Sequence, residues 1–350
     1  MLQYCKQSLT IFIFLGLLLA GCTDDKRPLP DVSDIQAPLE ILRFEQDLFG
    51  LDTNNFASSL AGLAAKYPEF AELFSTSILE AGSLGSMSPE QLDYFRGFVT
   101  SPVYRAVYDT TQLVFPDLKD QEKELQQALR YFRYHFPEVD APERLITFNS
   151  AFNYASIIFG NNELGASLDM FLGPDFDYQR YSPGAAIFSN YLVRTYNKDH
   201  LTASLLRVLL DDLFGNAPGT KLLDEMIHRG KKLYVLEQLL PETADTVIFR
   251  TTSAQQEWLV ENERNLWAHF QVEDLLYNSR FQDIRKLIEP SPSGSPVLPE
   301  ESPGEAANYV GYQIVKQFME RYPEIPLSDL LVYQDAQEIL EKSRYKPQRK

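Results

Sequence analysis

Both cysteines of this 350-residue chain lie within its first 22 residues, and this placement most constrains how the chain can fold. After Cys5 and Cys22 no thiol remains for a disulfide, a zinc–cysteine site or a cysteine nucleophile. Any folded part must therefore be held together by its core alone, which is feasible for a chain of this length. Aromatic residues make up 13% of the sequence, and this composition favours a packed core over disorder.

The residues around Cys22 have the pattern of a bacterial lipoprotein signal. Lys6 supplies a positive charge, residues 9–20 are apolar but too few to span a bilayer of about 30 Å, and Leu19-Ala20-Gly21-Cys22 forms a lipobox. The alternative is a plain secretory signal that ends near a cysteine. We predict a signal peptide at residues 1–21 and lipid (diacylglycerol and palmitate) on Cys22, with no other cofactor.

Acidic residues outnumber basic ones and give the chain a formal charge of −17. Removing residues 1–21 takes away one lysine and changes this charge to −18. Nucleic acid repels so acidic a chain, which excludes nucleic-acid binding as a function class. Residues 22–38 combine charges and prolines with little apolar periodicity, and they predict a flexible tether ahead of a single, mostly helical domain at 39–350.

From residue 39 the apolar pattern is helical, most clearly over 53–80, 89–110 and 117–136, and it is helical again from about 185 to 240. Short apolar segments separated by Asn and Gly predict strands of a small sheet at 145–149, 155–159 and 164–168. The predicted fold class is mainly α with a small β-sheet (α+β).

Further helices are expected in the last third of the chain. One begins after Ser253, with Gln256 as its capping-box partner, and another is opened by Ser302-Pro303. The proline-rich segment 289–304 predicts an internal surface loop. Gly311 lies inside the last of these helices, where glycine costs about 1 kcal/mol relative to alanine. Close approach of another backbone explains that cost.

The segment 224–228 would be an HExxH zinc motif if it began with histidine. On a helix from 220 to 236, Asp224, Glu225 and His228 fall on the arc opposite the buried stripe. An Asp/His pair one turn apart can bind a divalent metal, but a solvated polar face explains the same residues. We favour the solvated face.

Glu263 falls on the apolar side of its predicted helix, beside Leu266 and Phe270. A carboxylate in that position must be paired or hydrogen-bonded. One interpretation is a ligand or catalytic carboxylate with a raised pKa. The other, which we favour, is a structural anchor that accepts hydrogen bonds from loop amides. The sequence has no glycine-rich phosphate loop, no GxSxG elbow and no CxxC motif.

Several local patterns occur in a fixed order along the chain. They are ILRFEQDLF at 41–49, KYPEF at 66–70, LDMFLG at 168–173, LLDEMI at 222–227, QEW at 256–258, GYQIV at 311–315 and SRYKP at 343–347. Behind a lipobox, this series resembles the gliding-motility lipoprotein GldB family from about residue 39 onward. The resemblance implies a lipoprotein of the Gram-negative cell envelope, anchored to the membrane through Cys22, that contacts other gliding or secretion machinery.

The middle of that family is in turn similar to zincin-like metallopeptidase domains, in which a sheet precedes an HExxH helix and a later helix supplies an acidic ligand. This sequence departs from the pattern in either alignment. Asp224 replaces the first histidine if 224–228 is the motif, and no HExxH occurs in 191–200 if 220–234 is the later helix. We therefore expect a degenerate zincin-like domain with no catalytic residue and no metal.

The primary hypothesis is a non-enzymatic scaffold that acts through protein contacts. In it, Asp224, Glu225, His228 and Glu263 form at most a structural or vestigial site. The competing hypothesis is a lipid-anchored metallopeptidase with an atypical site built from Asp224, His228 and Glu263. A cell-wall glycan binder is a third possibility that the aromatic content permits.

Overall fold

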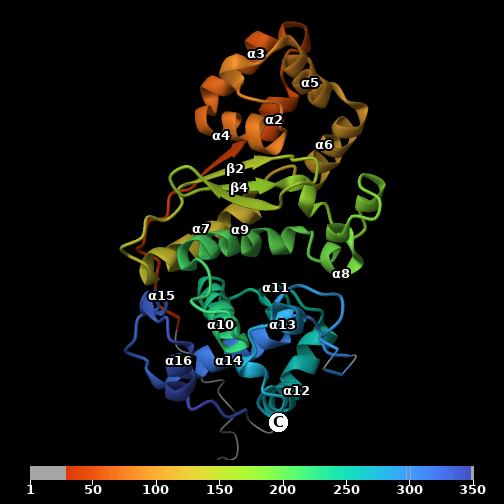
Figure 1. Cartoon of the computed structure of the whole chain (residues 1–350). Helices are drawn as coiled ribbons and strands as arrows, with labels where there is room; N and C mark the ends of the chain where they lie inside the picture. Colours follow the sequence, from red (N-terminus) through yellow and green to blue (C-terminus); the bar gives the residue numbers. More distant parts are fainter. Residues whose placement is uncertain (1–28, 297, 300, 348–350) are drawn as a thin grey trace, which may run out of the picture. The chain divides into compact units, whose positions relative to one another are not determined.

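The computed structural model describes residues 29–296, 298–299 and 301–347. The predicted signal peptide, Cys22 and the first part of the tether lie outside these residues. The described chain has an α+β fold of many helices and one small sheet (Figure 1), as the sequence predicts. Within it, no helix is both long and apolar enough to cross a membrane.

The sheet has four strands in the order β1-β2-β4-β3. The strands are β1 (Glu40–Arg43), β2 (Arg144–Phe148), β3 (Ser156–Phe159) and β4 (Glu163–Ser167). β1, β2 and β4 are parallel, and β3 pairs antiparallel with β4 at one edge. The three strands predicted between residues 145 and 168 are confirmed.

The helical prediction from residue 39 is wrong for β1. Its residues continue into a helix with apolar spacing, so the local pattern alone is ambiguous. They become a strand because they pair with β2, with Glu40 opposite Arg144, and these two side chains also form an ion pair of 3.2 Å. Long-range pairing thus overrides the local signal.

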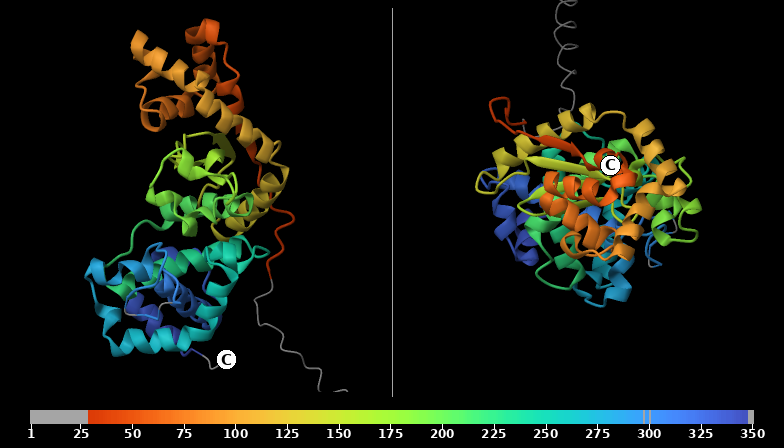
Figure 2. Two further views of the ribbon diagram at one scale, coloured as in Figure 1. Left: turned by 90° about the vertical axis from the view of Figure 1, so that its right-hand side faces the viewer. Right: turned by 90° about the horizontal axis from the view of Figure 1, so that it is seen from above.

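Helices from the first third of the chain cover one face of the sheet (Figures 1 and 2). They are α2 (Phe44–Phe49), α3 (Phe56–Lys66), α4 (Pro68–Leu73), α5 (Pro89–Thr100) and α6 (Pro102–Val114), with a π-turn at Phe74–Ile78. Phe44 is fully buried and packs its ring against Phe70 and Phe74, with centroids 4.9 and 5.0 Å apart. Phe148 of β2 joins this aromatic cluster, so it attaches these helices to the sheet.

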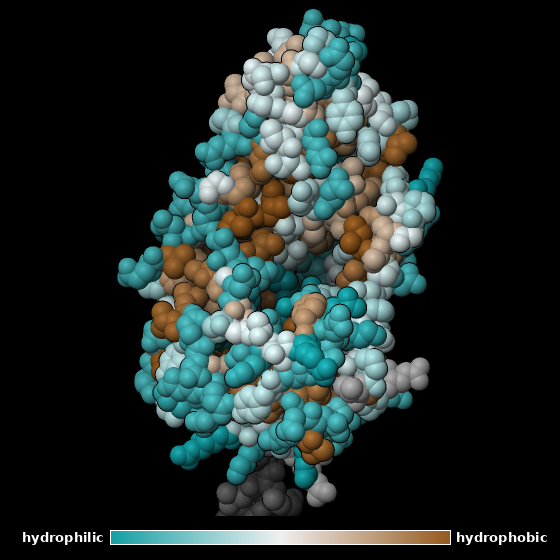
Figure 3. Space-filling model, viewed as in Figure 1, coloured by the Kyte–Doolittle hydropathy of each residue, from teal (hydrophilic) through white to brown (hydrophobic). Residues whose placement is uncertain are grey.

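A second, larger core lies on the other face of the sheet. There α9 (Lys198–Phe214) packs against β3 and β4, and α7 (Lys119–His135) packs against α9. The remaining helices are α8 (Asn190–Val193), α10 (Leu222–Leu239), α11 (Asp245–Ile248), α12 (Ser253–Val272), α13 (Phe281–Ile288), α14 (Ala306–Arg321), α15 (Asp329–Val332) and α16 (Ala336–Ser343). In the view of Figure 1, Figure 3 shows hydrophobic residues gathered at the level of the sheet and mainly hydrophilic ones over the helices below it.

α10 and α14 cross at two glycines. A Cβ on Gly230 would lie 2.5 Å from the carbonyl oxygen of Gly311, and a Cβ on Gly311 would overlap the backbone of Met226. The close backbone approach expected at Gly311 is therefore confirmed, and the sequence did not identify its partner, Gly230. Because neither position can carry a side chain, the two helices pack backbone to backbone.

Three boundaries differ from the sequence predictions. The capping box of α12 is Thr252 with Gln255, one residue earlier than expected, because the Thr252 hydroxyl accepts from the Gln255 amide at 3.2 Å. α14 begins at Ala306 after Glu305 in a left-handed conformation, so Ser302-Pro303 does not open it. Ser302 is instead buried, and its carbonyl accepts from Gly294 at 2.8 Å. The segment 289–304 is thus partly packed and not purely a surface loop.

The compact unit begins at Val32, ahead of the predicted domain boundary at residue 39. Val32 and Ala37 are both buried in the larger core. Residues 32–38 therefore belong to the packed domain and not to a flexible tether. Their few apolar residues are too widely spaced to produce a periodic pattern, so sequence analysis had no signal for this packing.

We expect Gly311→Ala to destabilise the fold, because the added methyl group would overlap a helix backbone that cannot yield as a side chain does. The expected loss in the free energy of unfolding is about 3 kcal/mol. Gly62→Ala is the matched control, since Gly62 is exposed on α3 with no atom near a new Cβ. The free energy of unfolding of that variant should rise by about 0.5–1 kcal/mol. Urea unfolding measures the free energy of unfolding of both variants. Equal changes in the two variants would contradict the close backbone contact between α10 and α14.

Candidate functional site

A cleft of about 640 Å³ lies beside α9 and α10. The chain segment after α11, at Phe249–Thr251, and the start of α14, at Glu305–Tyr309, close its other sides. Its lining combines polar and apolar side chains, and the residues Glu225, His228 and Arg250 are among them. The cleft is therefore the place where α10 could carry out chemistry.

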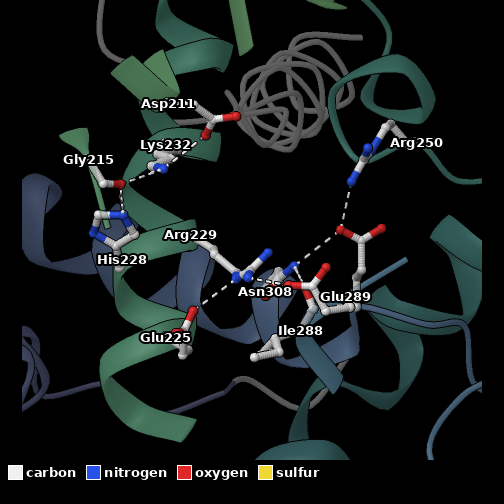
Figure 4. Close-up of polar contacts among 11 residues, drawn as sticks. Asp211, Gly215, Glu225, His228, Arg229, Lys232, Arg250, Ile288, Glu289 and Asn308 are labelled. Atoms are coloured by element: carbon white, nitrogen blue, oxygen red, sulfur yellow. Dashed lines mark hydrogen bonds and ion pairs between the residues drawn. The ribbon is translucent and has the colours of Figure 1, made fainter. Parts of the chain in front are cut away.

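His228 lies on α10 and is only 5% exposed. Its Nε2 donates to the carbonyl of Gly215 at 2.9 Å, and Lys232 donates to the same oxygen at 3.0 Å (Figure 4). The prediction of a solvated arc is wrong for this residue. α10 packs against α9 as well as α14, so its second face is also covered, and His228 ties α10 to the end of α9.

The two carboxylates of the HExxH-like segment are only partly buried. Asp224 accepts a hydrogen bond from the Lys221 amide at 3.1 Å and so caps the first turn of α10. Glu225 pairs with Arg229 one turn later at 3.1 Å, and Arg229 also pairs with Glu289 at 2.5 Å (Figure 4). Both acids therefore have local structural partners.

Glu263 lies on α12 and is half-buried. Its carboxylate accepts from the Tyr345 hydroxyl at 2.7 Å, and the Tyr345 ring packs edge-on against Trp267. Burial raises the pKa of Tyr345, and the charge of Glu263 raises it further. The carboxylate thus holds the C-terminal segment through the phenol of Tyr345, as an anchor would.

The structure does not bring these four residues together as one site. Of the described residues, Glu225 and His228 line the cleft, while Asp224 and Glu263 are not part of its lining. In the described part of the chain, no three His, Cys, Asp or Glu side chains are placed to hold a metal ion.

Sequence reasoning missed the basic residues of the cleft. Arg207 of α9 lies between buried leucines, and burial, together with the charge of Arg250, lowers its pKa to about 9. An arginine inside a leucine-rich helical segment was the available signal, because such a side chain needs a polar cavity or a partner. The cleft is also lined by Arg229, Lys232 and Arg250, and only the tertiary fold brings them together with Arg207.

A second polar cluster, also missed, lies at the carboxyl ends of the parallel strands. Asp169 is fully buried after β4, where it accepts from Ser167 Oγ at 2.5 Å and from the Phe152 amide at 3.0 Å. Burial raises the pKa of Asp169 to about 6. Phe152 and Ala151 both have left-handed backbones, so this carboxyl group holds a strained turn after β2.

We expect His228 to make the stability of the fold depend on pH. Burial first, and then the charge of Lys232, lowers its pKa to about 4, whereas an unfolded histidine titrates at about 6.5. Between these values the unfolded chain binds a proton that the folded chain excludes. Stability that is present above the unfolded pKa is therefore lost as the pH falls toward the folded pKa.

His228→Gln can keep a hydrogen bond to Gly215 but does not titrate. Relative to this variant, wild type should lose on the order of 2–3 kcal/mol in its free energy of unfolding as the pH falls through this window. Urea unfolding at several pH values measures the difference. Parallel pH profiles for the two proteins would contradict the prediction.

Comparisons with known proteins place the chain in one family. No curated protein and no solved structure matches it. The family described as gliding motility protein GldB matches residues 25–347, which is nearly the whole chain and includes every element of the cleft. The resemblance found in the sequence is thereby confirmed, and the chain belongs to the GldB family of gliding-motility lipoproteins.

Proposed function

We propose that this protein is a non-enzymatic scaffold of the gliding machinery, held at a membrane of the cell envelope by lipid on Cys22. Membership of the gliding-motility family supports the general role. The lipobox supports the anchor, and the large packed domain that begins at Val32 supplies surface for protein contacts. Such a protein acts by binding other proteins and holding them in place, and not by catalysing a reaction.

One observation carries the scaffold proposal. The four side chains that the sequence offers for chemistry each hold the fold: Asp224 caps α10, Glu225 pairs with Arg229, His228 bonds to Gly215 and Glu263 bonds to Tyr345. Catalytic groups are instead expected to converge on one reacting position. These side chains are distributed among separate structural contacts.

A lipid-anchored metallopeptidase is the competing proposal. A sheet that packs on α9, followed by α10, is consistent with the zincin-like alignment in which α10 is the later ligand helix. In that alignment residues 191–200 should carry HExxH, and their sequence does not contain it. The atypical site of Asp224, His228 and Glu263 is disfavoured because only His228 lines the cleft.

Colony spreading tests the proposed role. We expect deletion of the gene to abolish spreading and wild-type complementation to restore it. Cys22→Ala should fail to restore spreading because it removes the lipid site, while Cys5→Ala, in the predicted signal peptide, should restore it and serves as the matched control. Normal spreading without the gene would overturn the motility role, and full rescue by Cys22→Ala would overturn the anchor.

Zinc content separates the scaffold from the peptidase. We expect the purified full-length chain to contain substoichiometric zinc and His228→Gln to leave that content unchanged. The same variant should support spreading if it accumulates normally, because a scaffold needs the fold and not the titrating imidazole. One equivalent of zinc that disappears in His228→Gln would instead establish the metallopeptidase alternative.

A further inference from the structure

Four cations line the cleft beside α9 and α10, although the whole chain has a net charge of −17. Its cationic lining residues are Arg207, Arg229, Lys232 and Arg250. Its acidic lining residues are Asp211, Glu225 and Glu305. The lining thus holds four cations and three acids, and a fourth acid, Glu289, pairs with Arg229 from outside the lining.

Three of the four cations have acidic partners. The pairs are Lys232–Asp211 at 2.9 Å, Arg250–Glu305 at 2.8 Å and Arg229–Glu225 at 3.1 Å, and Figure 4 shows the residues around the cleft. Arg207 forms no ion pair with any residue that the structure describes; its Nη2 donates to the Ile248 carbonyl. Glu305 and Asp211 act on this charge without forming an ion pair with it, so Arg207 is the lining cation that has no direct acidic contact among the described residues.

Neighbouring side chains respond to this positive charge. Burial lowers the pKa of His200 on α9 to about 4, and the charges of Arg207 and Arg250 add to the effect. Burial lowers the pKa of Arg194; the charge of Glu305 opposes this shift, and the charge of Arg250 adds to it. With its pKa of about 9, Arg207 itself remains charged at neutral pH. An anion entering the cleft would therefore be attracted electrostatically.

The cleft also has an apolar wall. Leu210 of α9, Leu233 and Leu236 of α10, and Phe249 line it together with the charged residues. Its volume of about 640 Å³ is that of a site for an organic ligand and exceeds what a lone inorganic anion needs. The occupant that fits joins an anionic group to an apolar body.

We propose that the cleft binds a carboxylate-bearing peptide, with Arg207 as the main contact of the carboxylate and the leucine wall as the contact of a neighbouring apolar side chain. The planar guanidinium matches the two carboxylate oxygens. A single negative charge suits the cleft better than a phosphate dianion, because the acids of the cleft would repel a second charge. The same acids can accept hydrogen bonds from peptide amides.

Ligand-observed NMR titration of the full-length protein in detergent tests this binding. N-acetyl-leucine is the probe for a terminal carboxylate, N-acetyl-Leu-Glu-Leu-amide is the probe for a side-chain carboxylate, and N-acetyl-leucinamide is the neutral control. At least one acidic probe should bind saturably, and the neutral control about tenfold more weakly or less. Whichever acidic probe binds more tightly identifies the source of the carboxylate.

Arg207→Gln should weaken binding of the acidic probe by about tenfold or more, and Arg207→Lys should weaken it less because it keeps the charge. Arg264→Gln, the same change at an exposed position of α12, should have no effect. If Arg207→Gln does not fold, Arg207→Lys and Arg250→Gln provide the comparison.

Equal binding by wild type and these cleft variants would overturn the proposal. Failure of both acidic probes to bind would also overturn it. The proposal would fail as well if inorganic phosphate displaced the acidic probes at a lower concentration than acetate does. The proposal depends on the scaffold role only in attributing the peptide to a partner protein. NMR binding needs no gliding and colony spreading needs no probe, so the failure of one proposal is distinguishable from the failure of the other.

Discussion

The larger half of this protein depends on the backbone contact between α10 and α14. Gly230 and Gly311 allow the two helices to approach more closely than any side chain would permit, and a Cβ at either position would meet the other helix's backbone. Dispersion contacts accumulate along so close a crossing. This contact therefore fixes the position of α10. The elements that pack on the other face of α10 depend on that position.

The burial of α10 explains why its HExxH-like segment acts as structure. With α14 on one face and α9 on the other, His228 is almost completely buried, and its imidazole is hydrogen-bonded to the Gly215 carbonyl. Lys231 is also buried and donates to the carbonyls of Leu330 and Tyr333, at the end of α15. Polar side chains on this helix thus connect it to its neighbours, which is the role that buried polar groups most often have.

The cleft is the exception to this pattern. Its other cations form ion pairs, but Arg207 has no direct acidic contact among the described residues. Burying a cation without a direct acidic contact is unfavourable, so its presence is most simply explained by a function that uses it. A scaffold that recognises a carboxylate on a partner peptide makes such use of a fixed guanidinium without any bond chemistry.

The sequence by itself determined the α+β class, three of the four strands, the buried stripe of α10 and the close approach at Gly311, because each of these depends on periodicity or on an intrinsic property of one residue. Only the tertiary structure decided the rest. β1 exists because it pairs with a strand about one hundred residues away, and His228 is buried because α9 covers a face that looks solvated on an isolated helix. The cleft is assembled from separate segments of the chain, and no local pattern predicts which side chains meet across them.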